Sequence, residues 1–214
     1  YGWEVFDRNT DSRISALAQS SIAYPIKASG SVLLNPSLSI SYNDKIGLIL
    51  FTSEVELFIP PKKGRSHVLR IIRELLEFKP SNKSTNIAEA LKFLSNVIKK
   101  KAIVFVLSDY MDEGYGNTLK ILAGKHDITG IRVYDNKESS IPNLGLVHMR
   151  DEESGELVVI DTSSKNVRKG YSNYYNTSVN YFKEVFTKSG AGTIDCSVEE
   201  SYVKKLLGYF KRRA

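Results

Sequence analysis

The chain has a single cysteine, Cys196, so it cannot form an internal disulfide or a zinc site built from several cysteines. It has no apolar run of about eighteen residues, the length at which a segment is read as a membrane-spanning helix. Its three histidines, His67, His126 and His148, are scattered and lack the spacing of metal ligands. The first residues lack the basic-then-apolar layout of a signal peptide. We therefore expect a protein of a reducing compartment, located in the cytoplasm.

The charge is basic but locally concentrated. The formal net charge is +6, and 42% hydrophobic with 25% charged residues is typical of a soluble globular protein. Short basic runs lie at 60–65, 99–101 and 211–213. They are not interleaved with aromatic residues, so we interpret them as solvated helix ends, where lysine and arginine complement the helix dipole. Nucleic-acid binding is not favoured.

Segments typical of strands and helices alternate from residue 44 onward, which predicts an α/β fold with a mainly parallel central sheet flanked by helices. We expect one domain over residues 1–214, with an atypical stretch at 1–42 that contains Pro25, Gly30 and Pro36. The predicted strands are 45–51, 55–59 (ended by Pro60 and Pro61), 102–108 (a central strand), 127–135 and 192–198. The predicted helices are 65–78, 86–100, 116–124, 171–188 and a last one that contains Val203 to Phe210. Residues 144–162 are expected to add a β-hairpin.

The stretch AIVFVLSDYMDEG, residues 102–114, holds the strongest candidate for a site. Its apolar run stops at Asp109, and ligands of open α/β sheets bind beyond the carboxyl ends of the strands. Thr85 stands in the loop that enters the helix predicted at 86–100. A hydroxyl and a carboxylate would suit Mg²⁺, which prefers oxygen ligands. The alternative is structural, because Asn86 with Glu89 has the spacing of a capping box and Ser-Asp after a strand is a common turn.

Several segments resemble one bacterial family: YNDKIGLILFTSEVELFIPPKKGRSHVLRIIRELLEF, STNIAEALKFL, IVFVLSDYMDEGY, KHDITGIRVYDNKESSIPNLGLVHMRDEESGELVVIDT and YVKKLLGYFKRR. They are similar to the domain of unknown function 58 family, over about residues 42–214 in one unbroken order. That family resembles von Willebrand factor A domains, and its members are typically encoded beside a MoxR-type AAA+ ATPase. The resemblance implies a von Willebrand A-like, Rossmann-like fold.

The resemblance also implies a metal-ion-dependent adhesion site with three loops. Thr85 matches the second loop and Asp109 the third. The first loop should read Asp-x-Ser-x-Ser, which does not occur before residue 42. One alignment of VFDRNTDS puts Asp7, Asn9 and Asp11 at its ligand positions. A second alignment matches WEVFDRNT to a Trp-x-Val-x-x-Arg signature upstream of the domain, and the metal loop is then absent or degenerate.

From the resemblance we expect a non-catalytic protein-interaction module that binds Mg²⁺, with Mn²⁺ as a substitute. Its partner would be a MoxR-type ATPase or a client of that ATPase, with this chain as an adaptor in protein assembly or maturation. No sequence motif pairs a nucleophile with a base, which favours a binder over an enzyme. One alternative is a metal-free scaffold that binds through basic or tyrosine-rich surfaces; the tyrosines are Tyr171, Tyr174, Tyr175 and Tyr181. Another is a magnesium-dependent phosphate-ester hydrolase that uses Asp109.

Overall fold

Three parallel strands form the main sheet of the computed structural model, which describes residues 3–4, 45–81, 84–151 and 157–213. They are β4 (Ile103–Ser108), β5 (Asp127–Tyr134) and β8 (Gly192–Ser197), in the order β4-β5-β8. The mixed α/β class and the parallel sheet are confirmed. The central place predicted for 102–108 is wrong for this sheet, because β5 pairs with both β4 and β8.

Strand β4 is covered on both faces over most of its length, which explains its unbroken apolar sequence. Val104 and Val106 point into one buried cluster, while Leu107 belongs to another. Side chains of a strand alternate between the two faces of a sheet, so a strand that is buried on both faces is apolar at consecutive positions. Only its first residue, Ile103, is largely exposed, at 68%.

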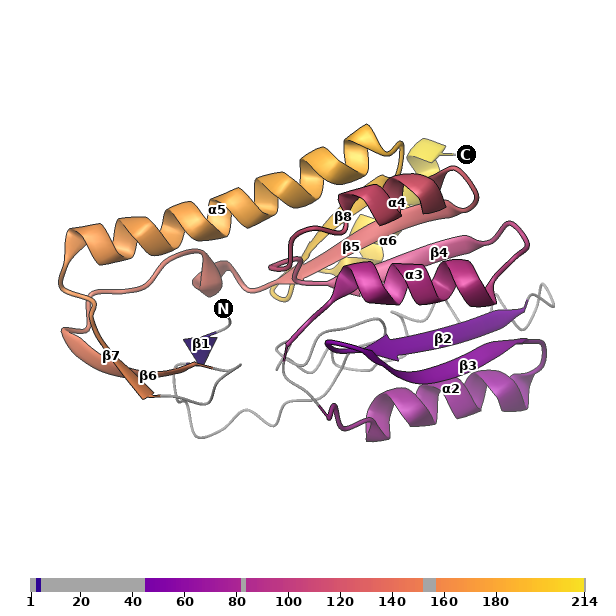
Figure 1. Cartoon of the computed structure of the whole chain (residues 1–214), viewed down its shortest axis with the longest axis horizontal. Coiled ribbons are helices and arrows are strands. Elements are labelled where there is room, and N and C mark those ends of the chain that lie inside the picture. Colours follow the sequence, from indigo (N-terminus) through magenta and orange to yellow (C-terminus); the bar gives the residue numbers. More distant parts are fainter. Residues whose placement is uncertain (1–2, 5–44, 82–83, 152–156, 214) are drawn as a thin grey trace.

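Helices lie on both faces of this sheet (Figure 1). One face packs against α3 (Ile87–Val97), α4 (Gly116–Ala123) and α5 (Lys165–Lys188), and the other packs against α6 (Tyr202–Arg213). The predicted helices are confirmed, but the one expected at 171–188 begins earlier, at Lys165. Its first turns are exposed, so they lack the apolar periodicity by which a helix is recognised.

An antiparallel pair forms a second, smaller sheet: β2 (Ile46–Phe51) and β3 (Val55–Lys62), with α2 (Arg65–Glu77) packed on it. The hairpin is as predicted, but Pro60 does not end β3. The pairing shifts register between Ile46, opposite Lys62, and Leu48, opposite Ile59. Proline lacks an N–H group and is tolerated in a strand at such an irregularity, which lets β3 run through both prolines.

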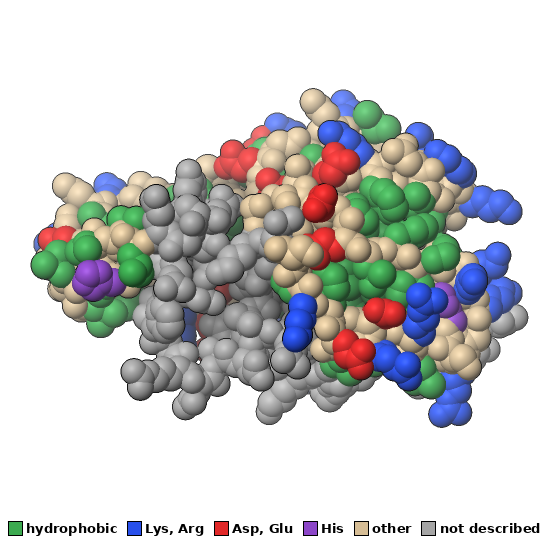
Figure 2. All heavy atoms as spheres, turned by 60° about the horizontal axis from the view of Figure 1, so that its bottom comes forward, with side chains coloured by type: hydrophobic (Ala, Val, Ile, Leu, Met, Phe, Trp, Pro, Cys, Tyr) green, Lys and Arg blue, Asp and Glu red, His purple; other side chains and the backbone are tan. Residues whose placement is uncertain are grey.

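A third sheet lies apart from the other two. The predicted hairpin is confirmed as β6 (Leu146–Asp151) and β7 (Leu157–Asp161), and β1 (Trp3–Glu4) pairs with β6. It stands beside the start of α5 at one end of the molecule (Figure 1). Leu146, Leu157 and Val159 are each more than half exposed, and Figure 2 shows hydrophobic side chains gathered at that end. In the described part of the chain no helix is long and apolar enough to cross a membrane.

Gly130 in the middle of β5 is required by the aromatic core above it. A Cβ atom there would lie 2.5 Å from Cε1 of Phe186 and 2.8 Å from Cε2 of Phe182, and both rings are fully buried. Gly130→Ala should therefore lower the free energy of unfolding by about 1–3 kcal/mol, the usual cost of overpacking a core. Urea denaturation measures it. Gly208→Ala in α6 is the matched control, because its Cβ would meet nothing within 4 Å. Equal losses in the two variants would contradict this account of Gly130.

Candidate functional site

The loop after β4 is a tight turn that fixes Asp109 at the carboxyl edge of the sheet. The N–H of Met111 donates to Oδ1 of Asp109 at 3.1 Å, and the N–H of Tyr110 donates to Oγ of Ser108 at 3.1 Å. Tyr110 has φ of 59°, a left-handed conformation that is strained for a bulky residue. Its buried hydroxyl donates to the carbonyl of Val106 at 2.6 Å, which anchors the turn in the core. The turn predicted as an alternative is present.

The loop that carries Thr85 is tied to two different strand ends. The N–H of Asn86 donates to the carbonyl of Thr52, after β2, at 2.9 Å. The N–H of Ile87 donates to Oδ2 of Asp112, in the loop after β4, at 2.7 Å. Because Ile87 is two residues from Thr85 and Asp112 three from Asp109, these bonds bring the two predicted loops together.

Asn86 is the N-cap of α3, as its sequence position predicts. Its Oδ1 accepts from the N–H of Glu89 at 2.9 Å. The reciprocal half of the predicted capping box is replaced, because the N–H of Asn86 is already bonded to Thr52. Asp112 adds a second cap, a carboxylate from outside the helix, and its charge also complements the positive end of the helix dipole.

Thr85 contributes an oxygen that is unsatisfied within the described part of the chain. Its Oγ1 is buried and makes no hydrogen bond within the described residues. A buried hydroxyl without a partner is costly, and such atoms commonly mark a bound ion or a functional position. The half-buried Asp109 is engaged through Oδ1 by the turn described above. The hydroxyl of Thr85 therefore suits a cation ligand. The carboxylate of Asp109 lies in the facing loop, three residues from Asp112.

Further carboxylates follow the neighbouring strand β5. Asp135 is 4% exposed and accepts from the N–H of Lys137 at 2.9 Å, which starts the short 3-10 helix η1 (Asn136–Ser139). Burial raises the pKa of Glu138 to about 7, and the charges of Asp109 and Asp135 act in the same direction. Sequence reasoning missed both residues, although the same signal, polar residues directly after a buried strand, was present in YDN. Both carboxyl groups lie at the same edge of the sheet as Asp109, but the raised pKa of Glu138 reduces its negative charge near neutral pH.

Two tyrosines of α5 are hydrogen-bonded to the loop that follows β4. The hydroxyl of Tyr181 accepts from the N–H of Gly114 at 2.9 Å, and that of Tyr174 donates to the carbonyl of Met111 at 3.5 Å. Tyr175 is buried and its hydroxyl accepts from Nη1 of Arg132 at 3.2 Å. Burial opposes the charge of Arg132, but the Asp195 carboxylate 2.6 Å from its Nε outweighs this, so the pKa of Arg132 is raised. Tyr175 is buried, as the packing interpretation predicts, whereas Tyr171, Tyr174 and Tyr181 are half-buried, and the predicted partner surface stays a prediction.

The remaining predicted ligands cannot be placed. Asp7, Asn9 and Asp11 lie outside the described residues. Among the residues that are described, no group of three or more histidine, cysteine, aspartate or glutamate side chains is arranged to hold a metal ion. Thr85 and Asp109 would thus supply part of a coordination sphere, and the rest must come from elsewhere.

Residues 29–180 match the sequence profile of the family described as "Protein of unknown function DUF58". The chain belongs to the DUF58 family. Uncharacterized proteins of Mycobacterium tuberculosis and Mycobacterium bovis are 22% identical to this DUF58 chain over 115 residues, which is 52% of the chain and 36% of each relative. The chain thus matches about a third of the length of these relatives.

Two solved structures are similar to the DUF58 chain. A conserved hypothetical protein BatB from Bacteroides thetaiotaomicron has a TM-score of 0.48 at 15% identity, covering 81% of this chain and 84% of that one. An aerotolerance-related membrane protein from Bacteroides fragilis has a TM-score of 0.41 at 16% identity, covering 71% and 85%.

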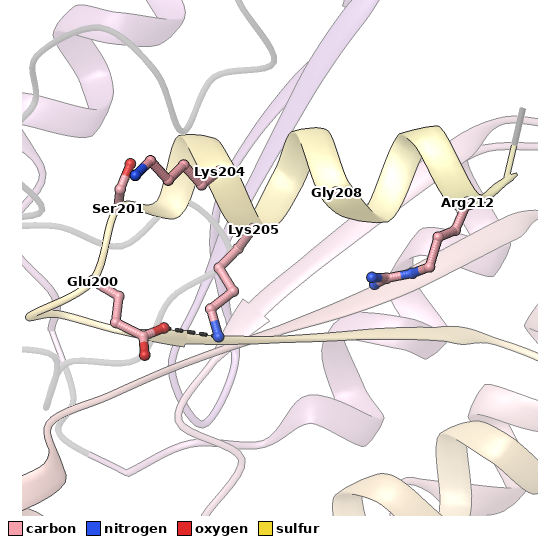
Figure 3. A pocket seen from close by; sticks show the side chains of 6 residues that line it. All are labelled: Glu200, Ser201, Lys204, Lys205, Gly208 and Arg212. Carbon is pink, nitrogen blue, oxygen red and sulfur yellow. Dashed lines mark ion pairs between the residues drawn. The ribbon is translucent and has the colours of Figure 1, made fainter.

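A shallow, open pocket of about 410 Å³ with a partly basic lining lies along α6 (Figure 3). Lys204, Gly208 and Arg212 follow one another at single-turn spacing along its wall, and Lys205 pairs with Glu200 at 2.8 Å. Gly208 has no side chain and so leaves the middle of the wall open. Since α6 covers the face of the sheet opposite α3, this pocket is separate from the Thr85 loop.

The carboxylate of Asp112 should stabilise the start of α3 and the site loops together. Asp112→Ala removes the acceptor of the Ile87 N–H, so we expect a loss of about 0.5–2 kcal/mol, the usual cost of deleting a helix cap. Amide hydrogen exchange of Ile87 should accelerate, which NMR detects for that single residue. Glu113→Ala, the neighbouring exposed carboxylate, is the control. An unchanged exchange rate at Ile87 in Asp112→Ala would show that the bond does not hold the loops.

Proposed function

We propose that this DUF58 domain is a von Willebrand A-like, non-catalytic binding module that uses a divalent cation held by Thr85 and Asp109. The observation that supports it most is the unsatisfied Oγ1 of Thr85, buried in the loop that Asp112 ties to the Asp109 turn. The DUF58 family membership and the parallel sheet are consistent with such a fold. The single-domain organisation over residues 1–214 stays a prediction.

The described residues suit a hard cation such as Mg²⁺. Thr85 would offer a neutral hydroxyl oxygen, and Asp109 a carboxylate, directly or through water, which are the ligand types that Mg²⁺ prefers. Asp135 adds a buried carboxylate at the same edge without being required as a ligand. In this proposal Asp7, Asn9 and Asp11 supply the first loop, and a carboxylate of the partner completes the coordination. A bound cation would supply the charge that attracts that carboxylate.

The proposed partner is a MoxR-type AAA+ ATPase or one of its client proteins, with this chain as an adaptor in protein assembly or maturation. Support comes from the family resemblance of the sequence. An acidic side chain on the partner would explain why recognition needs a cation at an edge that is itself acidic. Without the cation, Asp109, Asp135 and Glu138 would repel an acidic partner.

Titration calorimetry with Mn²⁺ or Mg²⁺ tests the site directly. We expect the unchanged chain to bind the ion, and Asp109→Ala and Thr85→Ala each to weaken binding at least tenfold, because each removes a proposed ligand. Glu113→Ala, which removes an exposed carboxylate from the same loop, should leave affinity nearly unchanged. Binding that survives both ligand variants would refute the proposed site, and equal loss in all three would indicate a diffuse effect of charge.

A metal-free scaffold is the second candidate, and the pocket along α6 favours it. Such a scaffold would bind an acidic partner through Lys204 and Arg212 without any ion. Pull-down of the neighbouring ATPase with and without a chelator separates the two candidates. If the ATPase stays bound in the presence of chelator but is released at high salt, the result would support the metal-free scaffold.

A further inference from the structure

The three basic runs of the sequence, far apart along the chain, lie at one end of the folded molecule. We call this the basic end, and it comprises eight exposed side chains: Lys62, Lys63, Lys99, Lys100, Lys101, Lys125, Lys211 and Arg212. Seven of these eight are lysines; the first and third runs also hold the exposed arginines Arg65 and Arg213. Figure 2 shows lysine and arginine side chains concentrated at the end where Figure 1 places the C-terminus.

The parallel sheet brings the second and third runs together. Strands β4, β5 and β8 begin at the same edge, with Ile103 opposite Asp127 and Gly192 opposite Thr129. Residues 99–101 immediately precede β4. Helix α6 ends beside the same edge, because Nη2 of Arg213 lies 2.8 Å from Oδ1 of Asp127, the first residue of β5.

The first run joins them through the smaller sheet. Lys62 at the end of β3 is paired with Ile46 at the start of β2. The loop from β3 to α2 is fixed there, since Nε2 of His67 is hydrogen-bonded to the carbonyl of Ile46 at 2.8 Å. Figure 1 shows this loop at the same end as the starts of β4 and β5.

Helix capping accounts for only part of this arrangement. Nζ of Lys99 donates to the carbonyl of Ser95 at 3.2 Å, and Lys211 and Arg212 lie in the last turn of α6, where they complement the dipole. Lys62 belongs to a strand, and Lys101 lies beyond the end of α3. Asp127, an acidic residue at this end, is already neutralised by Arg213. The opposite edge carries Asp109, Asp135 and Glu138 together with Lys137 and the first lysines of α6, so its charge is mixed, whereas the basic end is mainly positive.

We propose that the basic end docks on an anionic lipid surface. Clusters of about four to eight lysine or arginine residues are what the surface of an anionic bilayer attracts. Lysine is a compact charge that suits this diffuse attraction, whereas arginine is the residue of bidentate phosphate recognition in nucleic acids. Two exposed apolar side chains, Ile103 at 68% and Phe210 at 37%, stand beside the cluster, and the ring of Phe210 packs edge-on against Phe105. Such side chains can enter the headgroup boundary.

This inference does not rest on the proposed cation site, which lies at the opposite ends of the same strands. Docking by the basic end would leave the Asp109 edge directed away from the lipid. A protein bound at that edge would then stand clear of the membrane. The two surfaces are therefore compatible and separately testable.

Co-sedimentation of the whole chain with vesicles tests the proposal. We expect binding to phosphatidylcholine vesicles that contain about 30% phosphatidylserine, little binding to phosphatidylcholine alone, and weakening with added salt. The triple variant Lys99→Glu, Lys100→Glu, Lys101→Glu should bind at least about a hundredfold more weakly, since each lysine near an anionic surface contributes roughly fivefold and each glutamate adds repulsion.

The matched control is Lys137→Glu, Lys165→Glu, Lys169→Glu, which makes the same change in net charge at exposed positions outside the basic end. It should bind within a few-fold of the unchanged chain, and circular dichroism checks that both variants fold. Equal loss in the two variants would overturn the proposal in favour of net charge alone. Failure of the unchanged chain to bind phosphatidylserine, or tighter binding to duplex DNA than to the vesicles, would also overturn it.

Discussion

Two backbone N–H groups at the start of α3 hold the candidate site together. One, from Asn86, is bonded to the end of β2, and the other, from Ile87, is bonded to the side chain of Asp112 after β4. The first N–H groups of a helix have no partner inside it, so they must be satisfied from outside. Here the partners come from two strand ends that are distant in sequence.

The consequence is chemical as well as structural. Holding the loop in place buries the hydroxyl of Thr85, which has no hydrogen-bond partner among the residues that the structure describes. It also holds the Asp109 turn nearby, although that turn contains a tyrosine in a strained left-handed conformation. Backbone strain and unsatisfied polar atoms lower the stability of a fold. Proteins tend to retain both features at positions where a bound ligand offsets the loss. The proposed cation would satisfy the hydroxyl and offset the acidic charge of this edge.

Local features of this fold could be predicted from the sequence, and long-range ones could not. The apolar run of β4 and the polar residue that ends it are visible in thirteen consecutive letters, so Asp109 was correctly placed at the edge of the sheet. The role of Asp112 was not visible, because its partner is 25 residues away in sequence. The central position of β5 and the passage of β3 through Pro60 were also missed. Both features depend on which strand pairs with the one in question, and the sequence of a single strand does not specify its neighbour.

The same limit applies to charge. The basic runs looked like isolated helix ends until the parallel strands were seen to gather them at one end. Only the fold shows that positive charge gathers at the starts of the strands, at the end opposite Asp109. The molecule therefore has two distinct surfaces, and the carboxyl edge is the one on which the proposed binding function depends.

Paramagnetic line broadening by Mn²⁺ in the NMR spectrum of the whole chain tests that function most directly. A cation held by Thr85 and Asp109 would broaden the amide signals of residues 84–87 and 108–113 first, at low ion concentration, and would spare those of β7 and α6. Broadening that began elsewhere, or that spread evenly over the acidic surface, would contradict a specific cation site at this edge of the sheet.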